Sequence, residues 1–400
     1  MESLLINIIK NIDPADREMM QIARARQDSL AKPPGSLGEL EEISVRIAGM
    51  TGKVINTVDK GCVAVFCADN GVTAEGIASA PQSVTMAQTV NFTRRLTGVG
   101  ALAESFGSEL LIVDMGVKDK IPEELYDQRP LQDTRRIVNR RIRPETGETD
   151  NLAAGAAMSR EEALHCIQVG IEMADSIAFN GFEIMGVGEM GIGNTTSSAA
   201  VLSAITGRDA GQTVGRGGGI NDESFARKKE IVDRVSKPYR QVGGVIAGLT
   251  YGITEPEIEA AKKLAASRMV DVLAAMGGFD ICAMTGAFLG AAKNRMPVVI
   301  DGYISAVAAL AAYIIVPNSR DYMIASHKSF EKGYVLAVDL LGLRPFMALE
   351  MRLGEGSGCP IAFKIIKGAC DVMRNMATFA EADINDGYLE EIRNEKKFIK

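Results

Sequence analysis

Residues 182–198, FEIMGVGEMGIGNTTSS, place an apolar run, a glycine-rich stretch and a hydroxyl-rich stretch in direct succession. The apolar run predicts a buried strand, the glycines predict a loop, and the residues from Asn194 onward predict a helix. Glycines let backbone N–H groups approach an anion, hydroxyl groups add donors, and a helix N-terminus favours negative charge. We therefore interpret the stretch as a strand, a phosphate-binding loop and a helix. The alternative is a glycine-rich turn with a Thr or Ser helix cap, but a cap needs one hydroxyl and four are present.

The same strand pattern recurs along the chain. Short apolar runs that end in Asp, Gly or Ser occupy residues 62–72, 110–117, 296–302, 322–326 and 334–339. Alanine-rich segments of helical length separate most of these runs. Buried strands that alternate with helices indicate an α/β fold, with a mostly parallel sheet covered on both faces.

Ligands of such sheets bind at the carboxyl ends of the strands. We therefore expect functional side chains among the polar residues that end the predicted strands. These candidates are Asp69, Asp114, Glu189, Asp301, Ser326 and Asp339.

Composition narrows the function classes. The chain has 400 residues, of which 46% are hydrophobic and 24% are charged, so disorder is excluded. The net charge of −7 and the lack of a basic block with aromatic residues argue against nucleic-acid binding. No apolar run reaches 18 residues, and acids interrupt the apolar N-terminus. We therefore expect neither a membrane span nor a signal peptide, and we expect a cytoplasmic protein.

Metal and hydrolase chemistry are also disfavoured. The chain has six cysteines without a CxxC pair, and we expect them to be reduced and buried. His165 and His327 are the two histidines of the sequence, so a histidine-based zinc site is nearly excluded. No GxSxG motif accompanies either histidine. We predict no metal and no cofactor.

Other segments suggest the organisation of the chain. Residues 1–50 read as helices interrupted at 32–38 (KPPGSLG), and residues 360–400 read as helices with a charged tail. Residues 118–150 are polar and carry six arginines, so we interpret them as a solvated excursion; a phosphate-binding patch is the alternative. The apolar, Met-rich stretch MTGAFLGAAKNRM exceeds what the sheet needs for its cover and suggests self-association, although core packing could absorb it.

Two further glycine clusters follow the first. Residues 215–222 (GRGGGIND) precede a basic stretch, which alone is a weak signal. In residues 353–358 (LGEGSG), Glu355 is flanked by glycines, so its carboxylate can lie close to a ligand. Partial desolvation there would raise its proton affinity and suit it to work as a general base. A surface loop is the equally simple alternative.

Seven segments together resemble one enzyme family. KPPGSLGELE, ADNGVTAEGIASAPQSVTMAQTVNF, GVGEMGIGNTT, VGRGGGINDE, VVIDGYISA, ASHKS and LGEGSG occur in the order typical of nicotinate-nucleotide:5,6-dimethylbenzimidazole phosphoribosyltransferases. The resemblance implies a doubly wound, Rossmann-like sheet with a small helical domain formed from both chain ends. It thus implies a helical domain of residues 1–55 with 360–400, and a catalytic α/β domain of residues 56–359.

The resemblance also implies the chemistry and the site. Ribose 5-phosphate would move from nicotinate mononucleotide to a benzimidazole-type base, with Glu355 as the general base. The residues implied as substrate-binding are Glu189, Gly191, Gly193, Asn194, Thr195, Gln88, Lys228, Asp301, Ser329 and Gly354. The family enzymes are cytoplasmic dimers, so a homodimer is expected.

Three segments depart from the usual pattern of the family, and one of them, residues 118–150, is longer than usual. The chain has Asn70 where the family has a histidine, and Glu331-Lys332-Gly333-Tyr334 where the family has an EPGH-like segment. Two alternative functions therefore remain: a related transferase with a phenolic or purine acceptor, and a nucleotide-binding regulator without turnover. Glu355 argues against the regulator, because a binding module has no use for a carboxylate base.

Overall fold

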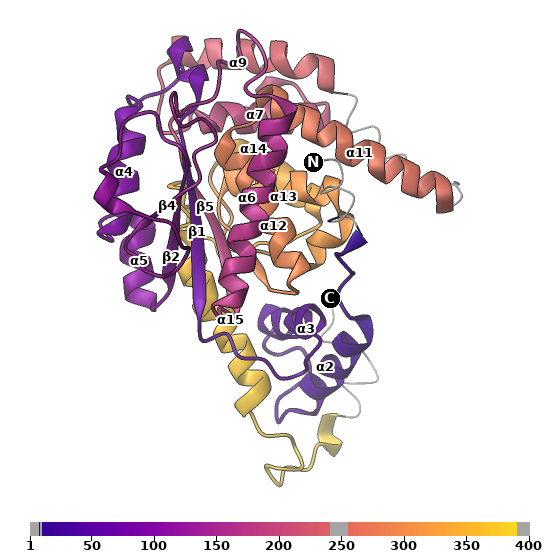
Figure 1. The fold of residues 1–400 in the computed structure, drawn as a ribbon. Coiled ribbons are helices and arrows are strands. Elements are labelled where there is room, and N and C mark those ends of the chain that lie inside the picture. Colours follow the sequence, from indigo (N-terminus) through magenta and orange to yellow (C-terminus); the bar gives the residue numbers. More distant parts are fainter. Residues whose placement is uncertain (1–7, 9, 241–254, 390–400) are drawn as a thin grey trace.

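A parallel sheet lies at the centre of the computed structural model, which describes residues 8, 10–240 and 255–389 (Figure 1). Within these residues the sheet has seven strands in the order β3-β4-β2-β1-β5-β6-β7, and all neighbouring pairs are parallel. The strands are β1 (Gly61–Ala68), β2 (Glu109–Gly116), β3 (Tyr126–Asp127), β4 (Ile137–Asn139), β5 (Ile184–Met190), β6 (Val298–Ile300) and β7 (Met323–Ala325). The chain runs outward from β1 through β2 and then returns to β5 on the other side of β1. The predicted α/β class is confirmed, and the switch point between β1 and β5 is where such folds bind ligands.

Helices cover both faces of the sheet (Figure 1). Helices α4 (Ser83–Thr93), α5 (Gly98–Phe106) and α15 (Gly358–Asn375) pack on one face. On the opposite face, α12 (Phe279–Lys293) packs against the central strands, and α6 (Arg160–Phe179) and α13 (Tyr303–Ile315) pack against α12. Strands β1 and β5 are buried almost throughout because both of their faces are covered, which explains their continuous apolar sequence.

The remaining helices are α7 (Asn194–Thr206), α8 (Ala210–Thr213), α9 (Asp222–Ser236), α11 (Glu255–Met276) and α14 (Lys332–Leu341). Short 3-10 turns occupy Gly71–Glu75, Glu123–Leu125, Lys237–Tyr239, Pro317–Tyr322 and Gly387–Leu389. Among the described helices, none is long and apolar enough to span a membrane.

Helices from the N-terminal and C-terminal parts of the described chain form a helical unit below the sheet (Figure 1). Helices α2 (Arg17–Ser29) and α3 (Glu39–Thr51) pack together, and α3 contacts α15. A separate apolar cluster joins Ala23, Val45 and Ala48 to Met373. Other residues of α3, such as Ile47, belong to the main core. The division at residues 55 and 360 therefore stays a prediction.

The predicted strand at 334–339 is wrong, because this segment lies in α14. Its buried residues are Gly333, Tyr334, Ala337, Val338 and Leu341, which follow the three- to four-residue spacing of a helix face rather than the alternation of a strand. Asp339 consequently lies on a helix and does not end a strand.

Two other interpretations need correction. Residues 118–150 are not wholly a solvated excursion, because β3 and β4 extend the sheet and Ile137 and Val138 are buried. The stretch MTGAFLGAAKNRM lies mostly in α12, whose residues from Phe279 to Ala292 are all buried within this chain. These apolar residues therefore pack in the core of this chain and do not indicate a contact with a second subunit. The six cysteines are free and buried, as predicted.

Candidate active site

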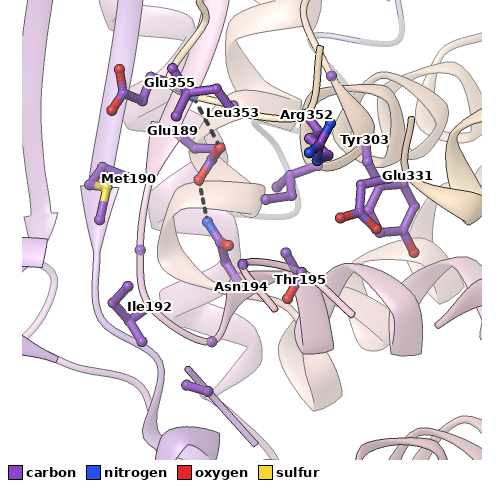
Figure 2. Close-up of a pocket in the computed structure, with 18 of the residues that line it drawn as sticks. Glu189, Met190, Ile192, Asn194, Thr195, Tyr303, Glu331, Arg352, Leu353 and Glu355 are labelled. Carbon is purple, nitrogen blue, oxygen red and sulfur yellow. Dashed lines mark hydrogen bonds between the residues drawn. The ribbon is translucent and has the colours of Figure 1, made fainter. Parts of the chain in front are cut away.

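A cavity of about 390 Å³ opens at the carboxyl ends of β5 and β6, beside the switch point (Figure 2). Its volume is in the usual range for a small-molecule site. Every site residue that the family resemblance implied lines this cavity: Gln88, Glu189, Gly191, Gly193, Asn194, Thr195, Lys228, Asp301, Ser329, Gly354 and Glu355. Residues far apart in the sequence thus meet at one edge of the sheet.

The glycine-rich loop joins β5 to α7, as predicted. Gly193 is the N-cap of α7, has a left-handed φ of 97° and leaves the helix without a side-chain cap. A Cβ atom on Gly191 would lie 2.2 Å from the carbonyl oxygen of Ala68, so this position excludes any larger residue. The loop therefore presents the N-terminus of α7 to the cavity, where a phosphate is favoured.

A buried cation lies beside this helix end. Nζ of Lys228, on α9, donates a hydrogen bond to Oγ1 of Thr195 at 2.8 Å, and the lysine is only 1% exposed. Burial lowers the pKa of Lys228 to about 8, and Glu331 opposes this shift. Gly217 of the second glycine cluster packs against Thr195, since a Cβ atom there would lie 3.1 Å from Oγ1. The second cluster therefore belongs to the same wall of the cavity.

The side chain of Asn194 bonds to two carboxylates rather than facing an anion. Its Nδ2 donates to Oε2 of Glu189 and, at 2.9 Å, to Oδ2 of Asp280 (Figure 2 shows the first bond). An amide nitrogen has two hydrogens, so both are used. The Asn194 side chain therefore has no N–H left for a substrate, and a contact of this residue with a phosphate would have to come from its backbone N–H.

Asp280, at the start of α12, was missed by the sequence analysis. It is fully buried, and burial raises its pKa to about 7. Burial, reinforced by the charge of Asp280, raises the pKa of Glu189 to about 8. An acid inside the apolar stretch GGFDICAM was the one signal in the sequence that could have indicated it.

Glu355 lies in the turn that precedes α15, with a left-handed φ of 64°. Its Oε2 accepts the N–H of Val99 at the start of α5 (3.1 Å), and its Oε1 accepts a hydrogen bond from Nε2 of Gln88 (3.4 Å). Burial raises the pKa of Glu355, and the hydrogen bonds from Val99, Gly98 and Gln88 partly offset this. A buried carboxylate with raised proton affinity is thus held in a fixed orientation at the cavity.

The turn around Glu355 rests directly on the backbone of β5. A Cβ atom on Gly188 would lie 2.4 Å from the carbonyl oxygen of Glu355, and a Cβ atom on Gly356 would lie 3.2 Å from Cα of Gly188. Glycine at both positions therefore allows the turn and the strand to touch without a side chain between them.

The other strand-end candidates divide into two groups. Glu189 and Asp301 line the cavity, whereas Asp69, Asp114 and Ser326 do not. Asp69 accepts hydrogen bonds from Thr85 and the backbone of Lys118, and Asp114 caps the end of β2. Asp114 and the loop that it caps lie outside the lining of the cavity.

His327 is a further cavity residue that the sequence analysis did not select. Its Nδ1 lies 3.0 Å from Oγ of Ser326, and its ring stacks on Tyr334. Burial lowers the pKa of His327 to about 4, so the ring is neutral at neutral pH. Its presence in ASHKS, one of the seven segments, could have indicated it.

The sheet, the loop at the N-terminus of α7, the buried lysine and the single held carboxylate define an α/β enzyme of the phosphoribosyltransferase class. A family model described as "Phosphoribosyltransferase" matches residues 12–250 and 253–384. The nicotinate-nucleotide–dimethylbenzimidazole phosphoribosyltransferase of Clostridium perfringens is 45% identical, over 99% of both chains. That of Clostridium tetani is 41% identical, over 98% of both chains.

The solved structures agree with these relatives. The crystal structure of CobT from Thermus thermophilus has 34% identity and a TM-score of 0.79, over 92% of this chain and all of that one. The chain therefore belongs to the nicotinate-nucleotide–dimethylbenzimidazole phosphoribosyltransferase family.

Proposed function

We propose that this protein transfers ribose 5-phosphate from nicotinate mononucleotide to 5,6-dimethylbenzimidazole or a related base. The products are α-ribazole 5′-phosphate and nicotinate. The membership in the family supports this reaction, and the cavity contains the groups that it requires.

The phosphate of the nucleotide binds at the N-terminus of α7. Lys228 supplies a positive charge there, and Thr195 accepts a hydrogen bond from the lysine and so keeps its own proton for the phosphate. Gly191 and Gly193 give the backbone the space for a close approach. With the phosphate bound there, the proposed reaction requires C1′ of the ribose to face the wall that carries Glu355.

The reaction is one displacement at C1′. A lone pair on the free ring nitrogen of the base forms the new C–N bond, and the bond from C1′ to the nicotinate nitrogen breaks. The leaving nitrogen takes the electron pair and departs as a neutral pyridine nitrogen, so it needs no general acid. Attack on the opposite face turns a β-nucleotide into an α-product.

Glu355 takes the proton that the acceptor must lose. The attacked base gains positive charge, and its N–H proton passes to the carboxylate of Glu355. The observation that carries the proposal is the orientation of this carboxylate, which Val99 and Gln88 fix at the cavity. One positioned carboxylate is sufficient for this chemistry.

Incubation with nicotinate mononucleotide and 5,6-dimethylbenzimidazole tests the proposal. Nicotinate and α-ribazole 5′-phosphate should appear in equal amounts, and Glu355→Gln should abolish most of the turnover. Turnover with a phenol or a purine but with no benzimidazole would favour the related transferase. Nucleotide binding without any product would favour the regulator.

We also propose a cytoplasmic homodimer. Exposed apolar side chains lie near the entrance of the cavity: Leu353, which lines it, is 59% exposed and Phe330 is 68% exposed. Leu96 and Leu349 are also exposed, and apolar surface of this kind is typical of a contact between subunits. A monomer mass in light scattering at working concentration would contradict the proposal.

A further inference from the structure

Glu355 is held in a backbone conformation that its own residue type does not favour. Its φ is 64°, and the neighbouring Gly354 and Gly356 both have a φ of 85°. A glutamate in the left-handed region costs conformational energy, and it persists where the surrounding structure fixes it. The turn must therefore be held by groups outside it.

Asp301 holds the turn on its far side. Its Oδ2 accepts the backbone N–H of Gly356 at 3.0 Å, and its Oδ1 accepts the backbone N–H of Gly358 at 2.7 Å. Asp301 directly follows β6 and is almost fully buried. One carboxylate thus ties the residues at one and three positions after Glu355 to the end of β6.

The fit around this carboxylate is tight. A Cβ atom on Gly358 would lie 2.9 Å from Oδ1 of Asp301 and 2.3 Å from Nδ1 of His327. The backbone N–H of Asp301 is itself bonded to Oγ of Ser305 at 3.2 Å, which fixes the end of β6. The carboxylate therefore has little freedom to turn toward a ligand.

We propose that Asp301 is a positioning residue that sets the place of Glu355 through the Gly356–Gly358 backbone, and that it is not a substrate contact. This inference rests on the proposed function, in which Glu355 takes the proton of the acceptor. It differs from the role that the family resemblance implies for Asp301, which is substrate binding.

The first test is Asp301→Asn. An asparagine has the same size, but its amide nitrogen cannot accept an N–H, so one of the two hydrogen bonds is lost and two donors face each other. The Glu355 carboxylate should then move by up to about 1 Å. Such a displacement of the general base should lower kcat by up to about 10²-fold. The affinities for nicotinate mononucleotide and for 5,6-dimethylbenzimidazole, measured by calorimetry, should stay nearly unchanged. An increase in either dissociation constant with unchanged kcat would make Asp301 a substrate contact and overturn the proposal.

Asp114→Asn is the matched control. Asp114 is fully buried, and its Oδ1 accepts the backbone N–H groups of Gly116 (2.9 Å) and Val117 (2.8 Å) at the end of β2. It therefore makes the same kind of contact as Asp301 but lies outside the cavity. Both variants should unfold at a lower temperature than the parent, whereas kcat should fall only in Asp301→Asn.

The double variant Asp301→Asn with Glu355→Gln separates positioning from a general loss of structure. If Asp301 acts through Glu355, the double variant should have nearly the kcat of Glu355→Gln alone. Losses of kcat that multiply would overturn the proposal. If Glu355→Gln itself keeps full turnover, the proposed function fails instead, whatever Asp301→Asn does.

If Asp301→Asn does not fold, Asp301→Glu replaces it as the test of the proposal. It keeps the negative charge and the acceptors but moves them by one methylene group. A lowered kcat with unchanged substrate affinity would support the proposal, and a kcat within a few-fold of the parent would overturn it.

Discussion

Nζ of Lys228 lies 2.8 Å from Oγ1 of Thr195, and the hydroxyl is the acceptor of this hydrogen bond. The lysine comes from α9 and the threonine from the first turn of α7, so the bond joins the helix after the second glycine cluster to the helix that follows the first glycine-rich loop. Because the ammonium group donates, the proton of the hydroxyl is free for another acceptor. The pair therefore provides a buried charge and an oriented donor at the same place.

Thr195→Val should chiefly weaken the binding of nicotinate mononucleotide. The variant loses the hydroxyl donor, and a hydrogen bond to a charged group contributes roughly 1.5–3 kcal/mol, which corresponds to about ten- to a hundredfold in affinity. Calorimetric titration measures the change. Thr206→Val, in the last turn of the same helix and bonded to the backbone of Leu202, is the control and should bind normally. Unchanged affinity in Thr195→Val would reduce the loop to an ordinary helix start.

Nucleotide affinity should depend on the charge of Lys228. Its pKa of about 8 means that the ammonium form is present below that pH and is lost above it. Affinity for nicotinate mononucleotide should therefore fall as the pH rises through about 8. In Lys228→Gln, affinity should be low and should change less over the same range. Lys229→Gln removes the same charge from the next residue, whose Nζ lies 4.6 Å from the ring centre of Phe225, and should keep the parental profile.

Glu355→Gln should lose about 10²–10⁴-fold in turnover and still bind both substrates. The positive charge on the acceptor exists in the transition state and not in the bound neutral base, so the carboxylate acts on kcat more than on affinity. Glu189→Gln is the comparison, since Glu189 lies in the same cavity. If Glu355→Gln turns over within a few-fold of the parent while Glu189→Gln is inactive, the roles are reversed.

Asp280→Asn should make folding stability less dependent on pH. Glu189 and Asp280 have pKa values of about 8 and about 7, both above their unfolded values, so the native state binds more protons than the unfolded state. Their contribution is present at low pH and is lost as the pH rises through about 7 to 8. The free energy of unfolding should fall over this range in the parent and less steeply in Asp280→Asn. Urea unfolding at about pH 5 and about pH 8.5 gives the change in the free energy of unfolding between the two pH values. The same change in the parent and in Asp280→Asn would contradict the prediction.

Benzimidazole and its methylated forms should all react. Gln88 and the apolar side chains of Val84 and Met190 line the cavity, and we expect such a wall to hold a flat base mainly by shape. One methyl group is worth only about 1–3 kcal/mol in such a pocket. Competition assays with pairs of bases measure the preference, and rejection of every benzimidazole would contradict it.

Local sequence patterns were sufficient for the parallel sheet and for the strand-end residues Glu189 and Asp301, whereas Gln88 and Lys228, which lie on helices, came only from the resemblance to the family. They were not sufficient for contacts that only the folded chain creates. Asp280 is 86 residues from Asn194, and no local pattern joins them. The orientation of the Asn194 amide and the two bonds of Asp301 were missed for the same reason. The wrong strand at 334–339 has another cause: an apolar run of six residues fits a strand and a buried helix equally well.

The contact between the Glu355 turn and Gly188 separates two properties that usually change together: the position of the Glu355 backbone and the shape of the cavity. Since main chain rests on main chain there, the separation between the backbone of Glu355 and β5 does not depend on the rotamers of Val84 and Ile304, which also line the cavity. If the proposed function is correct, we therefore expect exchanges at Val84 and Ile304 to change the size of the accepted base while the backbone of Glu355 stays in place. Acceptor preference can accordingly diversify, or be redesigned, on a scaffold whose chemistry remains constant.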